Sequence, residues 1–151
     1  LRALRSGIAD IVMDKTDFDW IADSQRYEAQ STERSLAAAV EIEAKRATGA
    51  APSLPLSAYA GIWRDPWYGD IVIERRDVQL WLRFTHNPAL QGPLEPYNGE
   101  TFRTRFPDKR EEDAFVTFEL QDGQPVRATV KGVSPDIDFS YDYQDLRLVR
   151  V

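Results

Sequence analysis

Apolar side chains recur every three or four residues in the first third of the chain and every second residue in most of the remainder. In residues 1–13 they stand at one helical spacing, which gives a single apolar face: Leu1, Leu4, Ile8, Ile11 and Val12. The polar stretch 14–17 (Asp-Lys-Thr-Asp) interrupts this pattern. The spacing therefore predicts a first helix that ends near Met13.

A second helix is predicted from near Trp20 to about Ala47. Asp17 or Asp19 is expected to cap its start, because a carboxylate accepts hydrogen bonds from the unpaired N–H groups there. The segment contains no Gly or Pro and is rich in strong helix formers. Its middle is polar on almost every side, which predicts a helix that buries little. Gly49 is expected to end it, and residues 50–55 indicate a linker.

From Tyr59 onward, apolar and polar residues alternate, as in strands with one buried face. The apolar members of four such runs are Val78, Leu80, Leu82 and Phe84, then Phe102 and Phe106 with Thr104 between them, then Val116, Phe118 and Leu120, and then Val126, Ala128 and Val130. Turn signals separate the runs, and no long helical crossover intervenes, so the strands should pair antiparallel. The predicted fold is mainly β with N-terminal helices: a helical segment (1–51), then a small antiparallel β-barrel (52–151) of seven or eight strands.

Composition narrows the functional classes. The net charge is −6 and the basic residues are scattered, whereas a nucleic-acid surface needs a basic stripe to neutralise phosphates. There is no cysteine, so thiolate metal sites and a cysteine nucleophile are excluded. No apolar run has the roughly 20 residues of a membrane-spanning helix. Because the chain opens with Leu1, we expect it to be processed or to be part of a longer protein.

The densest motif is Trp63-Arg-Asp65-Pro-Trp67-Tyr68-Gly-Asp70. Asp65 and Pro66 suit the first two positions of a type I turn, in which the Asp side chain bonds back to the backbone. Trp63, Asp65, Trp67 and Tyr68 are the candidate binding residues, because aromatic rings beside carboxylates suit a carbohydrate or acid/base site. The favoured interpretation is structural: the three aromatic side chains close one end of the barrel.

The acidic stretch near the C-terminus is a second candidate. On an extended strand, Asp136, Asp138, Ser140 and Asp142 would share one face and could bind Ca²⁺. The helix–loop–helix calcium pattern fails here, however, since Arg147 stands where the bidentate Glu is required. A solvated strand face opposite an apolar one is the favoured interpretation, and no metal or other cofactor is expected.

The remaining candidates are weaker. His86, the single histidine, is expected in an ordinary loop, because neither a second histidine nor a Gly-x-Ser-x-Gly elbow accompanies it. The acidic run 111–113 (Glu-Glu-Asp) is expected to be solvated. No glycine-rich phosphate loop occurs. No catalytic residue is therefore assigned, and an enzyme with an unrecognised site ranks third among the functional hypotheses.

The segment from Leu54 to Asp70 (Leu-Pro-Leu-Ser-Ala-Tyr-Ala-Gly-Ile-Trp-Arg-Asp-Pro-Trp-Tyr-Gly-Asp) resembles the start of a known domain. This is the small C-terminal domain of unassigned function that follows the catalytic domain in many bacterial serine hydrolases of the β-lactamase and penicillin-binding-protein type. Residues 82–90, 113–118 and 133–146 resemble later parts of that family in the same order. The resemblance spans essentially all of the β region.

The resemblance implies a lipocalin-like barrel and a parent enzyme that cleaves amide or ester bonds through an acyl-serine. Residues 1–47 would then correspond to the closing helix of the catalytic domain and its connector, and the parent could be periplasmic or secreted. The parent's Ser-x-x-Lys signature cannot be carried over, because no serine here is followed three residues later by lysine. The leading hypothesis is thus a non-catalytic accessory domain that shapes the substrate entrance or joins subunits.

Two further expectations concern partners. The expected partner is the catalytic domain of the same parent chain, and the apolar stripe of the first helix also predicts a homodimer through the N-terminal helices. The alternative function is a carrier that holds a small ligand inside the barrel, as eight-stranded barrels can. Filling of the interior by Leu82, Phe84, Phe102 and Phe118 would leave no room for such cargo.

Overall fold

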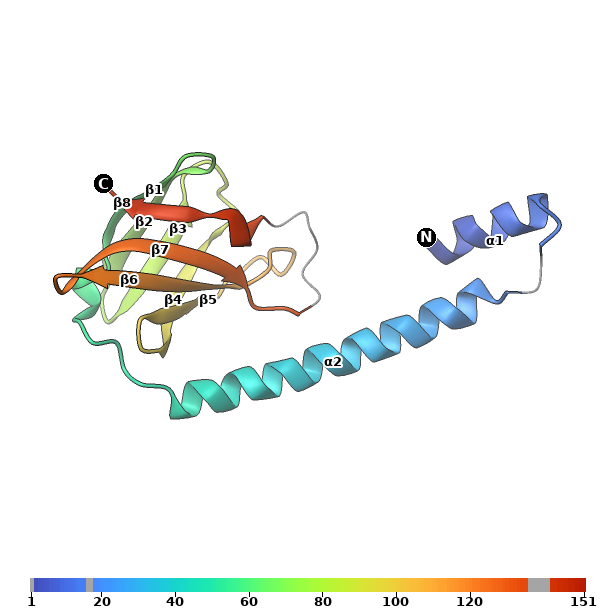
Figure 1. The fold of residues 1–151 in the computed structure, drawn as a ribbon, viewed down its shortest axis with the longest axis horizontal. Coiled ribbons are helices and arrows are strands. Elements are labelled where there is room, and N and C mark those ends of the chain that lie inside the picture. The colour runs from blue at the N-terminus through green and yellow to red at the C-terminus, as the bar shows by residue number, and fades with distance from the viewer. Residues whose placement is uncertain (1, 16–17, 136–141) are drawn as a thin grey trace. The chain divides into compact units, whose positions relative to one another are not determined.

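A computed structural model describes residues 2–15, 18–135 and 142–151 (Figure 1). The chain divides into two compact units, Leu1–Val40 and Glu41–Val151. The first contains α1 (Arg2–Val12) and most of α2 (Trp20–Thr48), and the second contains the end of α2 and all the strands. The fold is therefore mainly β with N-terminal helices, as predicted. The domain boundary predicted between residues 51 and 52 stays a prediction.

The helices begin and end where local chemistry favours it. Asp19 caps α2, because its Oδ1 accepts hydrogen bonds from the N–H groups of Ile21 and Ala22 at 3.1 and 3.0 Å. The indole N–H of Trp20 donates to the Asp10 carboxylate and ties the start of α2 to α1. The apolar stripe of α1 is exposed at Leu4, Ile8, Ile11 and Val12. Neither helix, within the described residues, is long and apolar enough to cross a membrane.

Eight strands form a closed antiparallel barrel in chain order, with β1 also paired to β8. Their bounds are β1 (Gly61–Asp65), β2 (Gly69–Arg76), β3 (Gln79–Phe84), β4 (Gln91–Asn98), β5 (Thr101–Thr104), β6 (Ala114–Gln121), β7 (Gln124–Gly132) and β8 (Arg147–Arg150). Successive strands run in opposite directions, so the β1–β2, β3–β4, β5–β6 and β7–β8 connections share one end. We call this the β1–β2 end, and the other turns lie at the opposite end.

Inward-facing side chains pack against one another in the barrel. Trp63, Phe102 and Phe118 are buried, and the Phe118 ring lies 5.1 Å from Trp63 and 5.4 Å from Phe102. Tyr59, from the segment before β1, adds a ring 4.8 Å from Phe102. Leu82 and Phe84 are buried in the same cluster. This ring-against-ring packing does not favour carriage of a ligand among these side chains.

Three local predictions are wrong. Val78 is exposed in the β2–β3 turn rather than inward, because β3 begins one residue later. An irregularity between Glu119 and Leu120 pairs Leu120 with Pro125, so Pro125 rather than Val126 is buried. Residues 143–145 form a 3₁₀ turn, η2 (Tyr143–Asp145), instead of continuing a strand. In that turn Tyr143 is buried, and its hydroxyl donates to the Glu112 carbonyl oxygen at 2.9 Å.

Candidate functional site

The β1–β2 turn is organised around the carboxylate of Asp65. Its Oδ1 accepts hydrogen bonds from the N–H groups of Trp67 and Tyr68 at 2.8 and 2.9 Å, which confirms the predicted turn chemistry. Its Oδ2 accepts the N–H of Arg147, at the start of β8, at 2.8 Å. Asp65 is only 4% exposed. With these three donors, both carboxylate oxygens are engaged with the backbone, so Asp65 positions the turn and is not free to bind a ligand.

Burial raises the pKa of the Asp65 carboxyl, but the three backbone N–H donors outweigh it, and the pKa lies below its ordinary value. The carboxyl is therefore ionised at neutral pH. A general acid must hold a proton at working pH, so this residue does not suit the general-acid part of the role that the motif left open.

The aromatic side chains of the motif do not act together. Trp63 is fully buried in the core, and its indole N–H donates to the Tyr59 carbonyl oxygen at 3.1 Å. Trp67 is 88% exposed, so the prediction that it closes the barrel is wrong. The physical reason is that the turn interrupts the strand alternation, and its tip carries Trp67 into solvent. Tyr68 lies between these extremes, with its ring 6.1 Å from Phe84 in an edge-on contact.

A pocket of about 400 Å³ lies beside this turn, at the β1–β2 end of the barrel. The residues that line it come from the turn and from the segment around η2: Asp65, Trp67, Tyr68, Asp142, Asp145 and Leu146. Asp142 and Asp145 are exposed. Asp142 was a candidate only in the calcium hypothesis, and Asp145 was not a candidate. Three of the four predicted residues thus line one pocket, whereas Trp63 lies in the core.

The charge in this pocket is negative. Burial raises the pKa of the Tyr68 hydroxyl, and the charges of Asp142, Asp65 and Asp145 raise it further. Tyr68 therefore remains a neutral hydroxyl at physiological pH. No Lys, Arg or His is among the described residues that line the pocket.

His86 lies on the other side of the same turn, in the exposed loop that was predicted for it. Gly69 has a φ of +73°, which favours glycine, and a Cβ there would come within 2.6 Å of the His86 ring. Arg64 holds Asp70 in a bidentate ion pair at 2.6 and 3.1 Å. The hydrogen bond from Arg64, with a smaller contribution from His86, lowers the pKa of Asp70. These contacts fix the outer edge of the turn.

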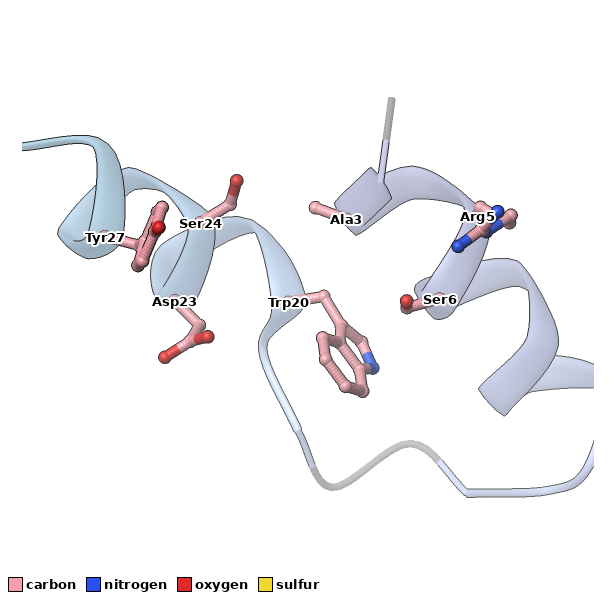
Figure 2. Close-up of a pocket in the computed structure, with 7 residues that line it drawn as sticks. All are labelled: Ala3, Arg5, Ser6, Trp20, Asp23, Ser24 and Tyr27. Atoms are coloured by element: carbon pink, nitrogen blue, oxygen red, sulfur yellow. The ribbon is translucent and has the colours of Figure 1, made fainter. Parts of the chain in front are cut away.

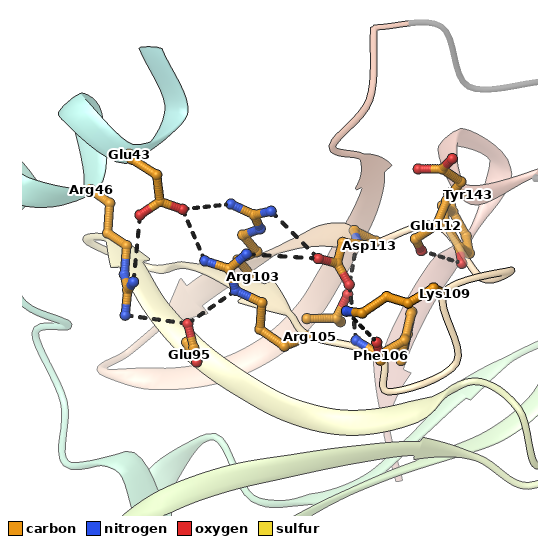
Figure 3. A network of polar contacts seen from close by, with 12 residues as sticks. Glu43, Arg46, Glu95, Arg103, Arg105, Phe106, Lys109, Glu112, Asp113 and Tyr143 are labelled. Carbon is orange, nitrogen blue, oxygen red and sulfur yellow. Dashed lines mark hydrogen bonds and ion pairs between the residues drawn. The ribbon is translucent and has the colours of Figure 1, made fainter. Parts of the chain in front are cut away.

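The last turns of α2 are tied to β4 and β5 by a carboxylate–guanidinium network (Figure 3). Glu43 Oε1 accepts hydrogen bonds from Arg103 and Arg105 at 3.0 and 2.9 Å. Arg46 pairs with Glu95 at 3.2 Å. The Arg105 hydrogen bond and the nearby charges of Arg103 and Arg46 lower the pKa of Glu43. Residues 43–46 therefore belong physically to the barrel unit.

Asp113 is a member of the same network, so the prediction of a wholly solvated acidic run is wrong. Its Oδ2 lies 3.4 Å from an Arg103 nitrogen, and its Oδ1 accepts the N–H of Phe106 at 2.9 Å. The side chain is mostly buried. The run of three acidic residues gave no sign of this, because the partners, Arg103 and the Phe106 backbone, lie 10 and 7 residues earlier in the chain.

Residues 50–53, which follow α2, are hydrogen-bonded to the β4–β5 turn, so they do not form the flexible linker that the sequence indicated. Ala50 donates its N–H to Asn98 Oδ1 at 3.0 Å and accepts the N–H of Gly99 at 2.8 Å. The Ser53 hydroxyl and the Tyr59 hydroxyl both donate to the Glu100 carboxylate. Burial and the Glu100 hydrogen bond raise the pKa of Tyr59 to about 12. The chain therefore enters the barrel through a bonded segment.

Gly49→Ala should loosen this entry. A Cβ at Gly49 would lie 2.3 Å from the Tyr97 carbonyl oxygen, which is backbone and cannot swing away. Overpacking of this kind lowers the free energy of unfolding by about 1–3 kcal/mol, and urea denaturation would measure it. Gly7→Ala in α1 is the matched control, because nothing lies within 4 Å of the added Cβ. Equal midpoints for Gly49→Ala and the unaltered chain would contradict the tight approach.

A further pocket, of about 330 Å³, lies within the first unit (Figure 2). Ala3, Arg5 and Ser6 of α1 face Trp20, Asp23, Ser24 and Tyr27 of α2 across it. Its lining mixes apolar and polar side chains without a nucleophile–base pair among the hydrogen bonds described there. We assign it no chemistry.

Three of the four residues in the calcium hypothesis, Asp136, Asp138 and Ser140, lie outside the described part of the chain. Within the described residues, no group of three or more His, Cys, Asp or Glu side chains is arranged to hold a metal ion. Asp142 follows the strand-like pattern in the sequence but stands directly before η2.

Comparison with known proteins gives one family and one solved structure. The C-terminal domain of penicillin-binding protein Rv0907 superposes with a TM-score of 0.47 at 19% identity, over 66% of this chain and 88% of that one. No curated protein matches the chain. The family model described as "Domain of unknown function (DUF3471)" matches residues 45–150. This match includes all eight strands and the fastened end of α2, and the chain therefore belongs to that family of domains of unknown function.

Proposed function

We propose that the chain serves as a non-catalytic accessory domain of a serine hydrolase of the β-lactamase and penicillin-binding-protein type. Its partner would be the catalytic domain of the same parent polypeptide, whose substrate entrance it shapes. The supporting resemblance lies in the segment from Leu54 to Asp70 and in the later segments that follow in the same order.

One observation carries this proposal furthest. The family match begins at residue 45, within the last turns of α2 that Glu43 and Arg46 tie to the barrel. The family unit thus includes the end of the incoming helix as well as the barrel. Bonds between the helix end and the barrel limit how the barrel moves relative to the sequence before it, which suits a domain that must hold a defined position.

The chain by itself should not catalyse hydrolysis. Purified protein is expected to cleave a chromogenic β-lactam, a D-amino-acid peptide and a simple ester at the buffer rate, because it lacks Ser-x-x-Lys. A turnover that survives purification and disappears on substitution of one serine or of His86 would contradict the proposal.

The accessory role is tested in the complete gene product. Removal of residues 52–151 should change kcat/KM for a bulky peptide substrate by more than it changes kcat/KM for a small ester, because only the bulky substrate reaches the entrance walls. An equal effect on both substrates would show that the domain acts on stability alone. No effect on either would contradict the entrance role.

Subunit association is the second form of this accessory role. It is supported by the exposed apolar stripe of α1, since leaving such area in water costs about 25 cal/mol per Å². Sedimentation of the intact chain and of a variant that begins at Pro52 tests whether the helical segment mediates association. A dimer that only the intact chain forms would place association in the helical segment.

A further inference from the structure

The pocket beside the β1–β2 turn contains an aromatic side chain that the fold presents to solvent. Trp67 is 88% exposed, although a tryptophan side chain gains by burial, as Trp63 of the same hairpin does. The backbone of the turn fixes the position of Trp67. Pro66 restricts the turn, and the buried Asp65 carboxylate holds the N–H groups of Trp67 and Tyr68. The indole is therefore mounted on a turn that is fixed from beneath.

The other residues that line the pocket offer hydrogen-bond acceptors, and no positively charged donor is among the described lining residues. Asp142 and Asp145 supply two exposed carboxylates, and η2 places both near the turn. Asp65 contributes negative charge but no free oxygen, because backbone N–H groups occupy both of its oxygens. Among the described lining residues, Tyr68 carries the one hydroxyl.

These features discriminate between ligand classes. A saccharide hydroxyl both donates and accepts, so sugar sites combine amide or basic donors with acceptors around the aromatic platform. An anionic ligand would face two carboxylates with no cation among the described lining residues. A cation next to an indole face and two carboxylates is attracted by both the ring and the charges.

We propose that this pocket, formed by Trp67, Tyr68, Asp142 and Asp145, binds an organic ammonium ion. The cation would lie against the Trp67 indole, with its charge toward Asp142 and Asp145 and its apolar part along Tyr68 and Leu146. The site is open to water, so binding is weak and falls as ionic strength rises. This inference does not rest on the proposed accessory role.

The direct test is a titration of the full chain with choline and with n-butylammonium. Binding is monitored through the NMR signal of the Trp67 indole N–H. We expect a saturable shift with both cations at constant ionic strength. The neutral isostere of choline, 3,3-dimethyl-1-butanol, should give none. The Trp67→Ala variant identifies the indole N–H signal, because that signal is lost from its spectrum. Choline binding to this variant, monitored through the Tyr68 backbone amide, should be about fivefold weaker.

Charge is tested by a matched pair of double variants. Asp142→Asn with Asp145→Asn should weaken choline binding about fivefold or more. Asp77→Asn with Asp122→Asn removes the same charge from exposed turns at the opposite end of the barrel, where asparagine tolerates the positive φ of 53° and 52°. This control should bind as the unaltered chain does.

Three outcomes would overturn the proposal. The first is the absence of a saturable shift up to about 50 mM cation, a range that spans weak millimolar binding. The second is an equal shift with the neutral isostere, which would indicate apolar contact alone. The third is saturation by N,N′-diacetylchitobiose but by neither cation, which would make the pocket a carbohydrate site.

Discussion

Trp63→Ala should lower the free energy of unfolding by about 3–5 kcal/mol, the usual loss when a buried aromatic side chain is truncated. Trp63 is fully buried and lies 5.1 Å, ring to ring, from Phe118. The truncation leaves a cavity in the barrel core and removes the donor to the Tyr59 carbonyl oxygen. Urea denaturation followed by circular dichroism measures the change, because it does not depend on the indole that is removed.

Trp67→Ala is the control for this prediction, since it removes the same side chain from the same hairpin. Trp67 is exposed, so its loss should change the free energy of unfolding by no more than about 0.5 kcal/mol. Equal destabilisation by the two variants would mean that Trp67 closes the barrel after all. A stable Trp63→Ala variant would mean that the core is packed differently.

Asp65→Ala should lower the free energy of unfolding at pH 7 by about 3 kcal/mol. The substitution leaves the N–H groups of Trp67, Tyr68 and Arg147 without their acceptor, in a place from which water is largely excluded. It also disconnects the β1–β2 turn from the start of β8, the strand that closes the barrel. Asp122→Asn, at an exposed turn where asparagine tolerates the positive φ of 52°, should cost far less.

The pH dependence of this effect has a definite sign. The folded-state pKa of Asp65 lies below its ordinary value of 3.8, so the ionised carboxylate stabilises the fold. That contribution is complete above the ordinary value and is lost as pH falls through the lower folded-state pKa. The difference in stability between the unaltered chain and Asp65→Ala should therefore be constant from about pH 5 to 7 and shrink below 3.8.

The difference between the unaltered chain and Asp65→Ala isolates this residue from other carboxyl groups with lowered pKa, such as Glu100 and Asp108. Both remain in Asp65→Ala, so their contributions cancel in the difference. A difference that stays constant down to pH 2.5 would show that the Asp65 charge does not contribute. A difference that grows on acidification would reverse the assigned direction of its pKa.

Much of the fold followed from local patterns in the sequence. Helical spacing located α1 and α2, and the Asp19 cap is a local signal because it acts on residues two and three positions away. Period-two alternation placed Phe102, Thr104 and Phe106 inward, and all three are buried. The Asp65–Pro66 turn was predictable for the same reason. In each case the stabilising partner lies within a few residues, or the pattern itself encodes which face is buried.

The outcomes that the sequence did not reveal depend on distant partners. Glu43 meets Arg103 and Arg105 across 60 and 62 residues, and Asp65 meets Arg147 across 82. No periodicity carries that information, because these meetings depend on barrel closure and on how the chain enters it. The pairing of β5 with β6 brings Arg103 next to Asp113, so Asp113 is paired rather than solvated.

The two tryptophans of the β1–β2 hairpin show most directly what the sequence predicted and what the tertiary structure decided. The sequence predicted that both side chains help to close the barrel, and of the two only Trp63 is buried, at an inward position of β1. The turn then breaks the alternation, so the direction of Trp67 is fixed only when Asp65 bonds to the turn and to β8. The sequence thus determined the elements, the core face and the turn, because these depend on near neighbours. The tertiary structure decided which polar and aromatic side chains meet, because closing the barrel brings together residues that lie far apart in the chain.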